Sequence, residues 1–197
     1  MATKVGINGF GRIGRAVARI ILQRKGELEL VAINDLADAK SLAHLFKYDT
    51  VMGPWKGPVE VKGDELVIDG KAIKVVAVRN PAELPWKDMG VTIAVESTGI
   101  FRTKESPKGG YMDHIKAGAK KVILTVPAKD DIDATVVLGV NDDTMTASTQ
   151  AISSTPVVPI ALSLAPGEST QLCESLCANA RMISPGRERP RFSAYTL

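Results

Sequence analysis

The chain has 197 residues, of which 45% are hydrophobic and 24% charged, and its formal net charge is +3. This composition is that of an ordinary globular protein, and the charge is too small to indicate nucleic-acid binding. No apolar stretch reaches the ~18 residues of a membrane span, and no secretory signal is visible at the N-terminus. We therefore expect a cytoplasmic protein without membrane contact, and its two cysteines, Cys173 and Cys177, fit a reducing compartment.

A glycine-rich turn follows the first apolar run, Val5 to Ile7. The turn contains Gly9-x-Gly11-x-x-Gly14, the spacing typical of dinucleotide-binding turns between a strand and a helix. Gly9 permits the tight turn, Gly11 lets the backbone approach a pyrophosphate, and Gly14 lets the helix pack closely on the strand. The helix N-terminus then offers N–H groups to the phosphates, although a tight turn without a ligand remains the alternative. The helical face is predicted to contain Ile13, Ala16, Val17, Ile20 and Ile21.

An acidic residue ends the second apolar run, Leu30 to Ile33, which leads into Asn34-Asp35. Asp35 lies 21 residues after Gly14, the place where a carboxylate meets the adenosine ribose in this kind of site. A carboxylate accepts hydrogen bonds from two ribose hydroxyls and repels a 2′-phosphate. The sequence therefore predicts NAD rather than NADP as the cofactor.

Helix-like and strand-like segments alternate along the rest of the chain. Helices are predicted at about residues 39–46 and 110–117, and strands at 59–61, 66–68, 73–78, 92–96, 121–124, 135–138 and 151–153. Turn signals at Gly63-Asp64 and Asp69-Gly70 make residues 59–78 an antiparallel meander. The predicted fold is α/β, a Rossmann-type parallel sheet with inserted antiparallel strands.

Polar residues recur where the predicted strands end, at Asp35, Ser97, Thr98 and Thr125. Ligands of open parallel sheets bind outside these strand ends, so the four residues together indicate a cofactor crevice. Ordinary strand-ending turns would explain each of them taken singly.

The composition changes after about residue 153. Prolines interrupt this segment, serines recur without a period, and lysine is absent from Ala151 onward. We therefore predict a cofactor domain at residues 1–153 and an irregular, poorly ordered tail at residues 154–197. The basic run at residues 186–191 is interpreted as a solvated end rather than a nucleic-acid patch.

With these residues in view, residues 1 to about 153 resemble the NAD-binding domain of the phosphorylating glyceraldehyde-3-phosphate dehydrogenases. The matching segments, in order, are residues 5–15 (VGINGFGRIGR), 33–36 (INDL), 48–49 (YD), 84–86 (LPW), 95–101 (VESTGIF), 117–122 (AGAKKV) and 140–141 (VN). The Arg-Ile pair within the opening motif is typical of this family. The resemblance implies an oxidoreductase of glycolysis that uses NAD and glyceraldehyde 3-phosphate. It also implies a homotetramer, for which this chain carries an incomplete surface because the family assembles largely through its second domain.

The resemblance also implies cofactor-binding roles for individual positions. They form three groups, for the pyrophosphate (Gly9, Gly11, Arg12, Ile13 and Gly14), for the adenosine (Asp35 and Arg79) and for the nicotinamide side (Ser97, Thr98, Gly99, Phe101 and Thr125).

The resemblance does not extend to the residues that carry out catalysis in the family. The family attacks its aldehyde with a cysteine thiolate that a histidine activates, and this cysteine follows the strand that residues 151–153 match. Here that strand leads into Ser154-Thr155-Pro156, without a cysteine, and the second domain with its histidine and phosphate-binding residues is expected to be absent. We therefore assign no catalytic residue, and enzymatic activity stays open.

The two cysteines near the C-terminus are the alternative source of a catalytic thiolate. Cys173 and Cys177 are spaced to share a helix face, but a metal pair would need two more ligands and none is evident nearby. A nucleophile needs a positioned base, and the two histidines, His44 and His114, lie within the predicted fold. We interpret His114 as a surface or hydrogen-bonded residue, and we expect neither a metal site nor rescued catalysis.

A frameshift would explain the altered tail, and we state it as a hypothesis. One choice of codons for residues 154–162 (TCA-ACG-CCT-GTT-GTA-CCA-ATT-GCC-TTG), read from the last base of the first codon, gives Asn-Ala-Cys-Cys-Thr-Asn-Cys-Leu. This nearly reproduces the family's catalytic segment. The nucleotide sequence of the gene tests the frameshift hypothesis, since other codons for residues 154–162 would contradict it.

Three functions remain open on the sequence alone. The chain is a fragment of the enzyme family that keeps the NAD site without turnover, an NAD-binding module with a role in binding or interaction, or a dehydrogenase completed by a partner chain. An assay of NADH formation separates the third from the other two.

Overall fold

The structure is a computed structural model that describes residues 2–24, 26–137 and 141–154. In chain order its elements are β1 (Thr3–Asn8), α1 (Arg12–Gln23), β2 (Leu28–Asn34), α2 (Ala39–Lys47), β3 (Tyr48–Asp49), β4 (Gly53–Pro54), β5 (Val59–Lys62), β6 (Glu65–Ile68), β7 (Lys71–Val76), η1 (Pro81–Glu83), β8 (Ile93–Glu96), α3 (Asp113–Lys116), β9 (Lys121–Leu124), β10 (Ala134–Thr135), η2 (Asp142–Thr144) and β11 (Ala151–Ser153). The tail predicted for residues 154–197 lies outside the described residues except for Ser154.

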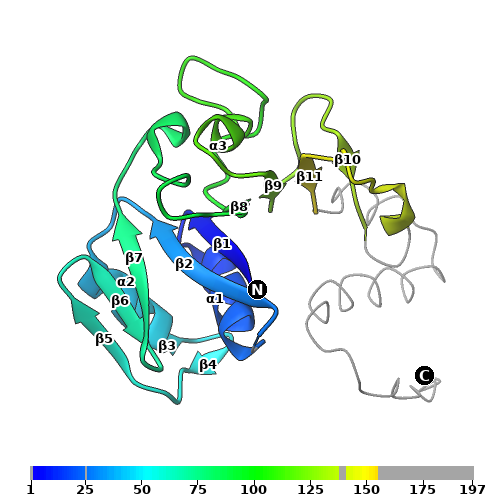
Figure 1. The fold of residues 1–197 in the computed structure, drawn as a ribbon. Coiled ribbons are helices and arrows are strands. Elements are labelled where there is room, and N and C mark those ends of the chain that lie inside the picture. Colours follow the sequence, from blue (N-terminus) through cyan, green and yellow to red (C-terminus); the bar gives the residue numbers. More distant parts are fainter. Residues whose placement is uncertain (1, 25, 138–140, 155–197) are drawn as a thin grey trace, which may run out of the picture.

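A mixed sheet forms the centre of the fold (Figure 1). Nine of the described strands pair in the order β10-β11-β9-β8-β1-β2-β7-β6-β5. Pairing is parallel from β10 to β7, and β6 runs antiparallel to both β7 and β5. The prediction of a parallel α/β sheet with an antiparallel insertion is confirmed. Strands β3 and β4 pair separately and were not predicted.

The order of the strands reverses at β1. The chain leaves β1 through α1 to form β2 on one side, and it later returns to form β8 on the other side. The register pairs Asn8, the last residue of β1, with both Asn34 of β2 and Glu96 of β8. The carboxyl ends of these three strands therefore meet at the switch point where open α/β sheets hold their ligands.

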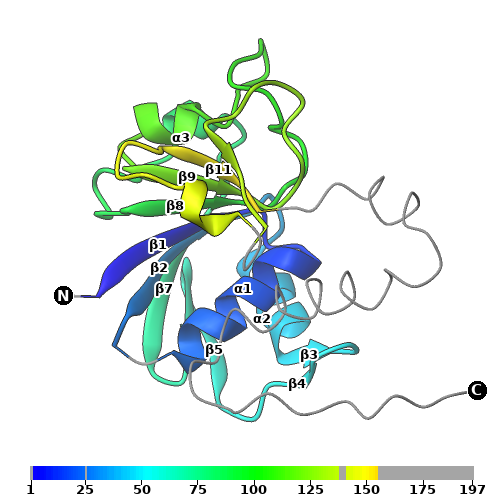
Figure 2. The same ribbon diagram turned by 90° about the vertical axis from the view of Figure 1, so that its right-hand side faces the viewer.

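Two buried clusters cover the two faces of the sheet. Ile7 and Ile33 pack with residues of α1 and α2, and Figure 2 shows both helices on the same side of the sheet. Ala32 and Ala94 pack with Trp86 in the other cluster. Ala32 and Ile33 are neighbours on β2 and belong to different clusters, because successive side chains of a strand point to opposite faces.

The predicted apolar face of α1 is only partly correct, because Ile21 is buried and Val17 packs against the core, but the buried face is centred on other residues. Residues Gly14, Ala18, Arg19, Ile21 and Leu22 are buried, and Ile13 is 53% exposed. Arg19 explains the difference because its guanidinium donates to the carbonyl oxygens of Gly53 and Phe46 and stacks over the ring of Phe46. The buried face of α1 thus extends to a cationic side chain that the hydrophobic pattern did not include.

Helix α3 and strand β10 are also shorter than predicted. Helix α3 covers Asp113–Lys116 instead of residues 110–117, because the Asp113 carboxylate accepts a hydrogen bond from the Gly110 N–H and Gly118 takes φ 112° directly after the helix. Strand β10 covers Ala134–Thr135 instead of residues 135–138, of which residue 138 lies outside the described part.

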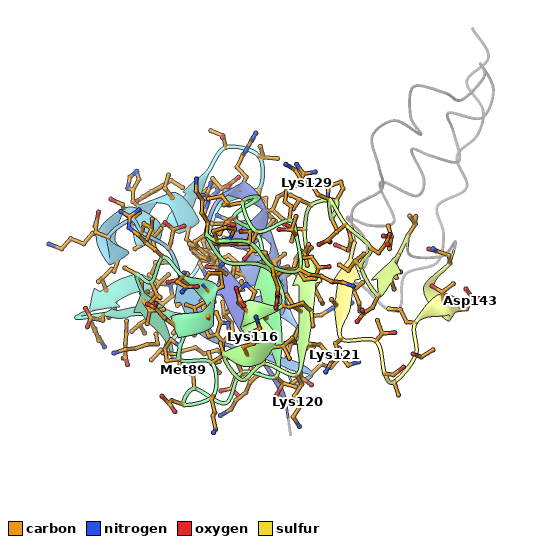
Figure 3. All side chains as sticks on the ribbon, turned by 90° about the horizontal axis from the view of Figure 1, so that it is seen from above. Met89, Lys116, Lys120, Lys121, Lys129 and Asp143 are labelled. Carbon is orange, nitrogen blue, oxygen red and sulfur yellow. The ribbon has the colours of Figure 1, made fainter. Side chains whose placement is uncertain are left out.

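Polar contacts hold the segment before β11 against the sheet. The ammonium of Lys121, labelled in Figure 3, donates to the carbonyl oxygens of Ala147 (3.3 Å) and Thr149 (2.5 Å). The Asp133 carboxylate accepts the N–H groups of Gln150 and Ala151, each at 3.0 Å. The bonds from Ala151 and Gln150 hold the pKa of Asp133 below its usual range.

Asp133→Asn is therefore expected to lower the free energy of unfolding by less than about 1 kcal/mol at neutral pH, because a charged acceptor becomes a neutral one at a site that water screens. The folded-state pKa is depressed, so the carboxylate stabilises the fold above its ordinary pKa of about 3.9 and loses this effect as the pH falls through the lower folded value. Urea unfolding of both proteins from pH 7 to pH 3 measures the difference, and Asp131→Asn, an exposed neighbour, is the control. A difference that stays constant with pH contradicts the assignment.

Candidate functional site

The glycine turn joins β1 to α1 at the switch point. Gly9 takes φ 90° and donates its N–H to the carbonyl oxygen of Asn34 (2.8 Å). Ser97, directly after β8, donates its hydroxyl to the carbonyl oxygen of Gly9 (2.6 Å). Gly11 is the N-cap of α1, and no side chain caps this end of the helix. The first-turn N–H groups are therefore placed to receive an anion.

The three glycines have different surroundings. A Cβ atom built on Gly14 would lie 2.1 Å from the carbonyl oxygen of Gly9, and one on Gly9 would lie 2.7 Å from the backbone nitrogen of Thr98. A Cβ on Gly11 would meet no protein atom within 4 Å. Gly9 and Gly14 are thus needed for packing, whereas Gly11 leaves open space where a phosphate approaches a helix N-terminus.

Asp35 extends the site from the end of β2. Its Oδ2 accepts the N–H of Phe10 (2.7 Å) and its Oδ1 accepts the N–H of Ala37 (3.0 Å). These two bonds fix the half-buried carboxylate next to the glycine turn. A carboxylate has about four acceptor positions, so lone pairs remain for the two hydroxyls of a ribose.

A cavity of about 490 Å³ lies outside these strand ends. Among the predicted site residues it is lined by Gly9, Gly11, Asp35, Arg79, Ser97, Thr98 and Phe101. Residues from the ends of β1, β2 and β8 are thereby brought together, although the ends of β1 and β8 are 88 positions apart in the sequence. The open helix N-terminus and the anchored carboxylate face one cavity, and these residues fit a dinucleotide.

Other predicted residues lie beside this lining. Arg12 and Ile13 are exposed on the first turn of α1, Gly14 is buried beneath it, and Gly99 is exposed with φ 75°. Thr125 is half-buried after β9, where its hydroxyl donates to the carbonyl oxygen of Glu96 (3.2 Å).

Sequence reasoning missed the remaining lining residues, Asn8, Asn34, Leu36, Val78, Ile100 and Lys108. All but Lys108 are direct sequence neighbours of a predicted residue, so extending each motif by one position would have found them. Lys108 comes from the loop between β8 and α3 and has no such signal. A second cavity of about 740 Å³ between the start of α2 and the β5–β6 turn contains none of the predicted residues.

Within the described residues, no helix has the length and hydrophobicity to cross a membrane, and no three His, Cys, Asp or Glu side chains form a group that could hold a metal ion.

The parallel sheet, the glycine turn at a helix N-terminus and the carboxylate after the next strand define a dinucleotide-binding protein of the Rossmann type. Residues 3–104 match the family described as "Glyceraldehyde 3-phosphate dehydrogenase, NAD binding domain". The chain belongs to this family, and the comparison confirms NAD as the cofactor of the domain.

Comparisons with individual relatives agree with this assignment. The chain is 52% identical over 152 residues to the glyceraldehyde-3-phosphate dehydrogenase of Borreliella burgdorferi, a match that covers 77% of this chain and 44% of that protein. It is 55% identical over 141 residues to the enzyme of Thermotoga maritima, covering 71% and 41%. The chain therefore spans less than half the length of these relatives.

Proposed function

We propose that the chain binds NAD in the cavity at the ends of β1, β2 and β8. The proposed contacts are Gly9, Gly11, Arg12, Ile13 and Gly14 for the pyrophosphate, Asp35 and Arg79 for the adenosine, and Ser97, Thr98, Gly99, Phe101 and Thr125 for the nicotinamide side. The observation that carries this proposal is the Asp35 carboxylate, anchored at 2.7 Å by the N–H of Phe10, in the same cavity as the open N-terminus of α1.

The further proposal is that this domain serves an oxidoreductase of glycolysis acting on glyceraldehyde 3-phosphate in the cytoplasm. Bound NAD supplies a hydride acceptor, and the role of these residues is to hold and orient it. The chain is proposed to divide into a cofactor domain, residues 1–153, and a separate tail, residues 154–197. It is proposed to have no aldehyde turnover of its own. The support is that residues 1–153 contain no cysteine, and Cys173 and Cys177 lie outside the described residues.

Calorimetric titration of the purified chain with NAD tests the binding proposal. We expect saturable binding weaker than in a complete family member, where a second domain helps to close the site. Absence of binding at millimolar NAD would overturn it. An assay of NADH formation with glyceraldehyde 3-phosphate and phosphate tests the proposal that the chain has no aldehyde turnover of its own, and we expect no NADH to form. Turnover by the purified chain would overturn it.

A further inference from the structure

A row of buried polar side chains lies behind the cofactor cavity. Trp86, His114 and Glu96 are each 0% exposed, Asn8 is 1% exposed and Asn34 is 4% exposed. Burial of so many polar groups is costly unless each is hydrogen-bonded. Of these five, only Asn8 and Asn34 line the cavity.

The hydrogen bonds determine which nitrogen of His114 carries the proton. The indole Nε1 of Trp86 lies 2.9 Å from His114 Nδ1. An indole N–H only donates, so Nδ1 must accept and the imidazole proton must be on Nε2. His114 Nε2 lies 3.0 Å from Glu96 Oε2 and donates to it.

The Glu96 carboxylate accepts four hydrogen bonds. Its Oε2 accepts from His114 Nε2 and from the side-chain amide of Asn8 (2.5 Å). Its Oε1 accepts the N–H of Thr98 (2.9 Å) and the hydroxyl of Thr98. A carboxylate only accepts, so every one of these bonds points toward Glu96 and satisfies the buried charge.

The bonds continue into the cavity wall. The amide nitrogen of Asn34 donates to Asn8 Oδ1 (2.6 Å), and the N–H of Val78 donates to Asn34 Oδ1 (2.8 Å). The hydroxyl of Thr98 accepts the N–H of Ile100 (3.1 Å). These five residues all line the cavity, so its wall is hydrogen-bonded to Glu96 from the ends of β1, β2, β7 and β8.

We propose that Trp86, His114 and Glu96 are positioning residues for NAD binding. The indole holds the imidazole in its Nε2-protonated form, the imidazole holds the Glu96 carboxylate, and the carboxylate holds Asn8 and Thr98 in the cavity wall. This role rests on the proposed NAD site, because the wall it organises is the wall of that site.

The protonation of His114 is the first test, and it needs no cofactor. The chain has two histidines, and His44→Gln removes the exposed one, so the imidazole signals can be assigned. Nitrogen-15 NMR of the full chain is expected to show His114 protonated on Nε2 and unprotonated on Nδ1. An Nδ1-protonated or doubly protonated ring would overturn the proposal, and this measurement stands even if a variant at His114 fails to fold.

A matched pair of variants is the second test. In His114→Gln one amide oxygen can accept from Trp86 and one amide N–H can donate to Glu96, whereas His114→Leu offers neither. We expect the NAD Kd of His114→Gln within about threefold of the native value and that of His114→Leu raised about tenfold, because the loss of the buried bond from His114 releases the Glu96 carboxylate. Circular dichroism and thermal unfolding report the folded fraction in each protein.

The outcomes separate this role from the proposed function. If His114→Leu unfolds at lower temperature but binds NAD with the native Kd, the residue is structural and the positioning role fails while NAD binding stands. Equal losses of affinity in the two variants also overturn it. If the native chain binds no NAD, the proposed function fails first, and the positioning role fails with it.

Discussion

Gly11→Ala is expected to leave the fold intact and to weaken NAD binding by about tenfold to a hundredfold, a range typical of one methyl group forced into occupied space. The residue has φ −70°, which any amino acid adopts, and no protein atom lies within 4 Å of the added Cβ. The methyl group therefore meets only the space in which the pyrophosphate is proposed to lie. Calorimetry with NAD and thermal unfolding of the same samples measure the two effects separately.

Gly14→Ala is the matched comparison. Its Cβ would lie 2.1 Å from the carbonyl oxygen of Gly9, a backbone atom that cannot move away cheaply. We expect a loss of about 3 kcal/mol in unfolding free energy, at the upper end for an overpacked methyl group. Native affinity in Gly11→Ala would show that the pyrophosphate does not approach the helix at this residue.

The elements with local signals could be predicted from the sequence. Apolar runs gave the parallel strands, and the Asp69-Gly70 turn, with φ 50° and 79°, gave the hairpin between β6 and β7. The burial of Arg19 on α1 could not be predicted, because it depends on carbonyl groups of Phe46 and Gly53, which come from a later part of the chain.

In the candidate site too, residues with a local sequence pattern could be predicted and residues joined only by long-range contacts could not. Gly9, Gly11 and Asp35 could be predicted, because their spacing along the chain is the one that a strand, a turn and a helix require. The bond between Asn8 and Glu96 joins residues 88 positions apart and has no local pattern. His114 was predicted to be a surface or hydrogen-bonded residue; the structure shows it hydrogen-bonded and 0% exposed, a distinction set by Trp86 and Glu96.

Asp35→Asn is expected to reduce the preference for NAD over NADP. We expect the native chain to bind NAD at least about tenfold more tightly, because a 2′-phosphate would lie next to the carboxylate that accepts the ribose hydroxyls. Replacing the carboxylate by an amide removes this repulsion, so the ratio of the two Kd values should fall toward one. Titrations with both cofactors at equal ionic strength measure that ratio.

Asp38→Asn is the control for the loss of one negative charge. The hydroxyl and N–H of Ser41 hold the pKa of Asp38 below its usual range, so Asp38 is ionised at neutral pH, as the control requires. Asp38 lines the second cavity and not the cofactor cavity, and asparagine is as good a helix N-cap as aspartate. This variant should keep the native ratio of Kd values.

The ratio is more informative than either affinity alone, because Asp35 also has a structural role. Its two oxygens accept the N–H groups of Phe10 and Ala37, and an amide offers an oxygen to only one of them. Asp35→Asn therefore loosens the turn and weakens both cofactors together, by about tenfold for one lost charge-assisted bond. Loss of repulsion affects NADP alone. An unchanged ratio in Asp35→Asn would mean that this carboxylate shapes the turn but does not select the cofactor.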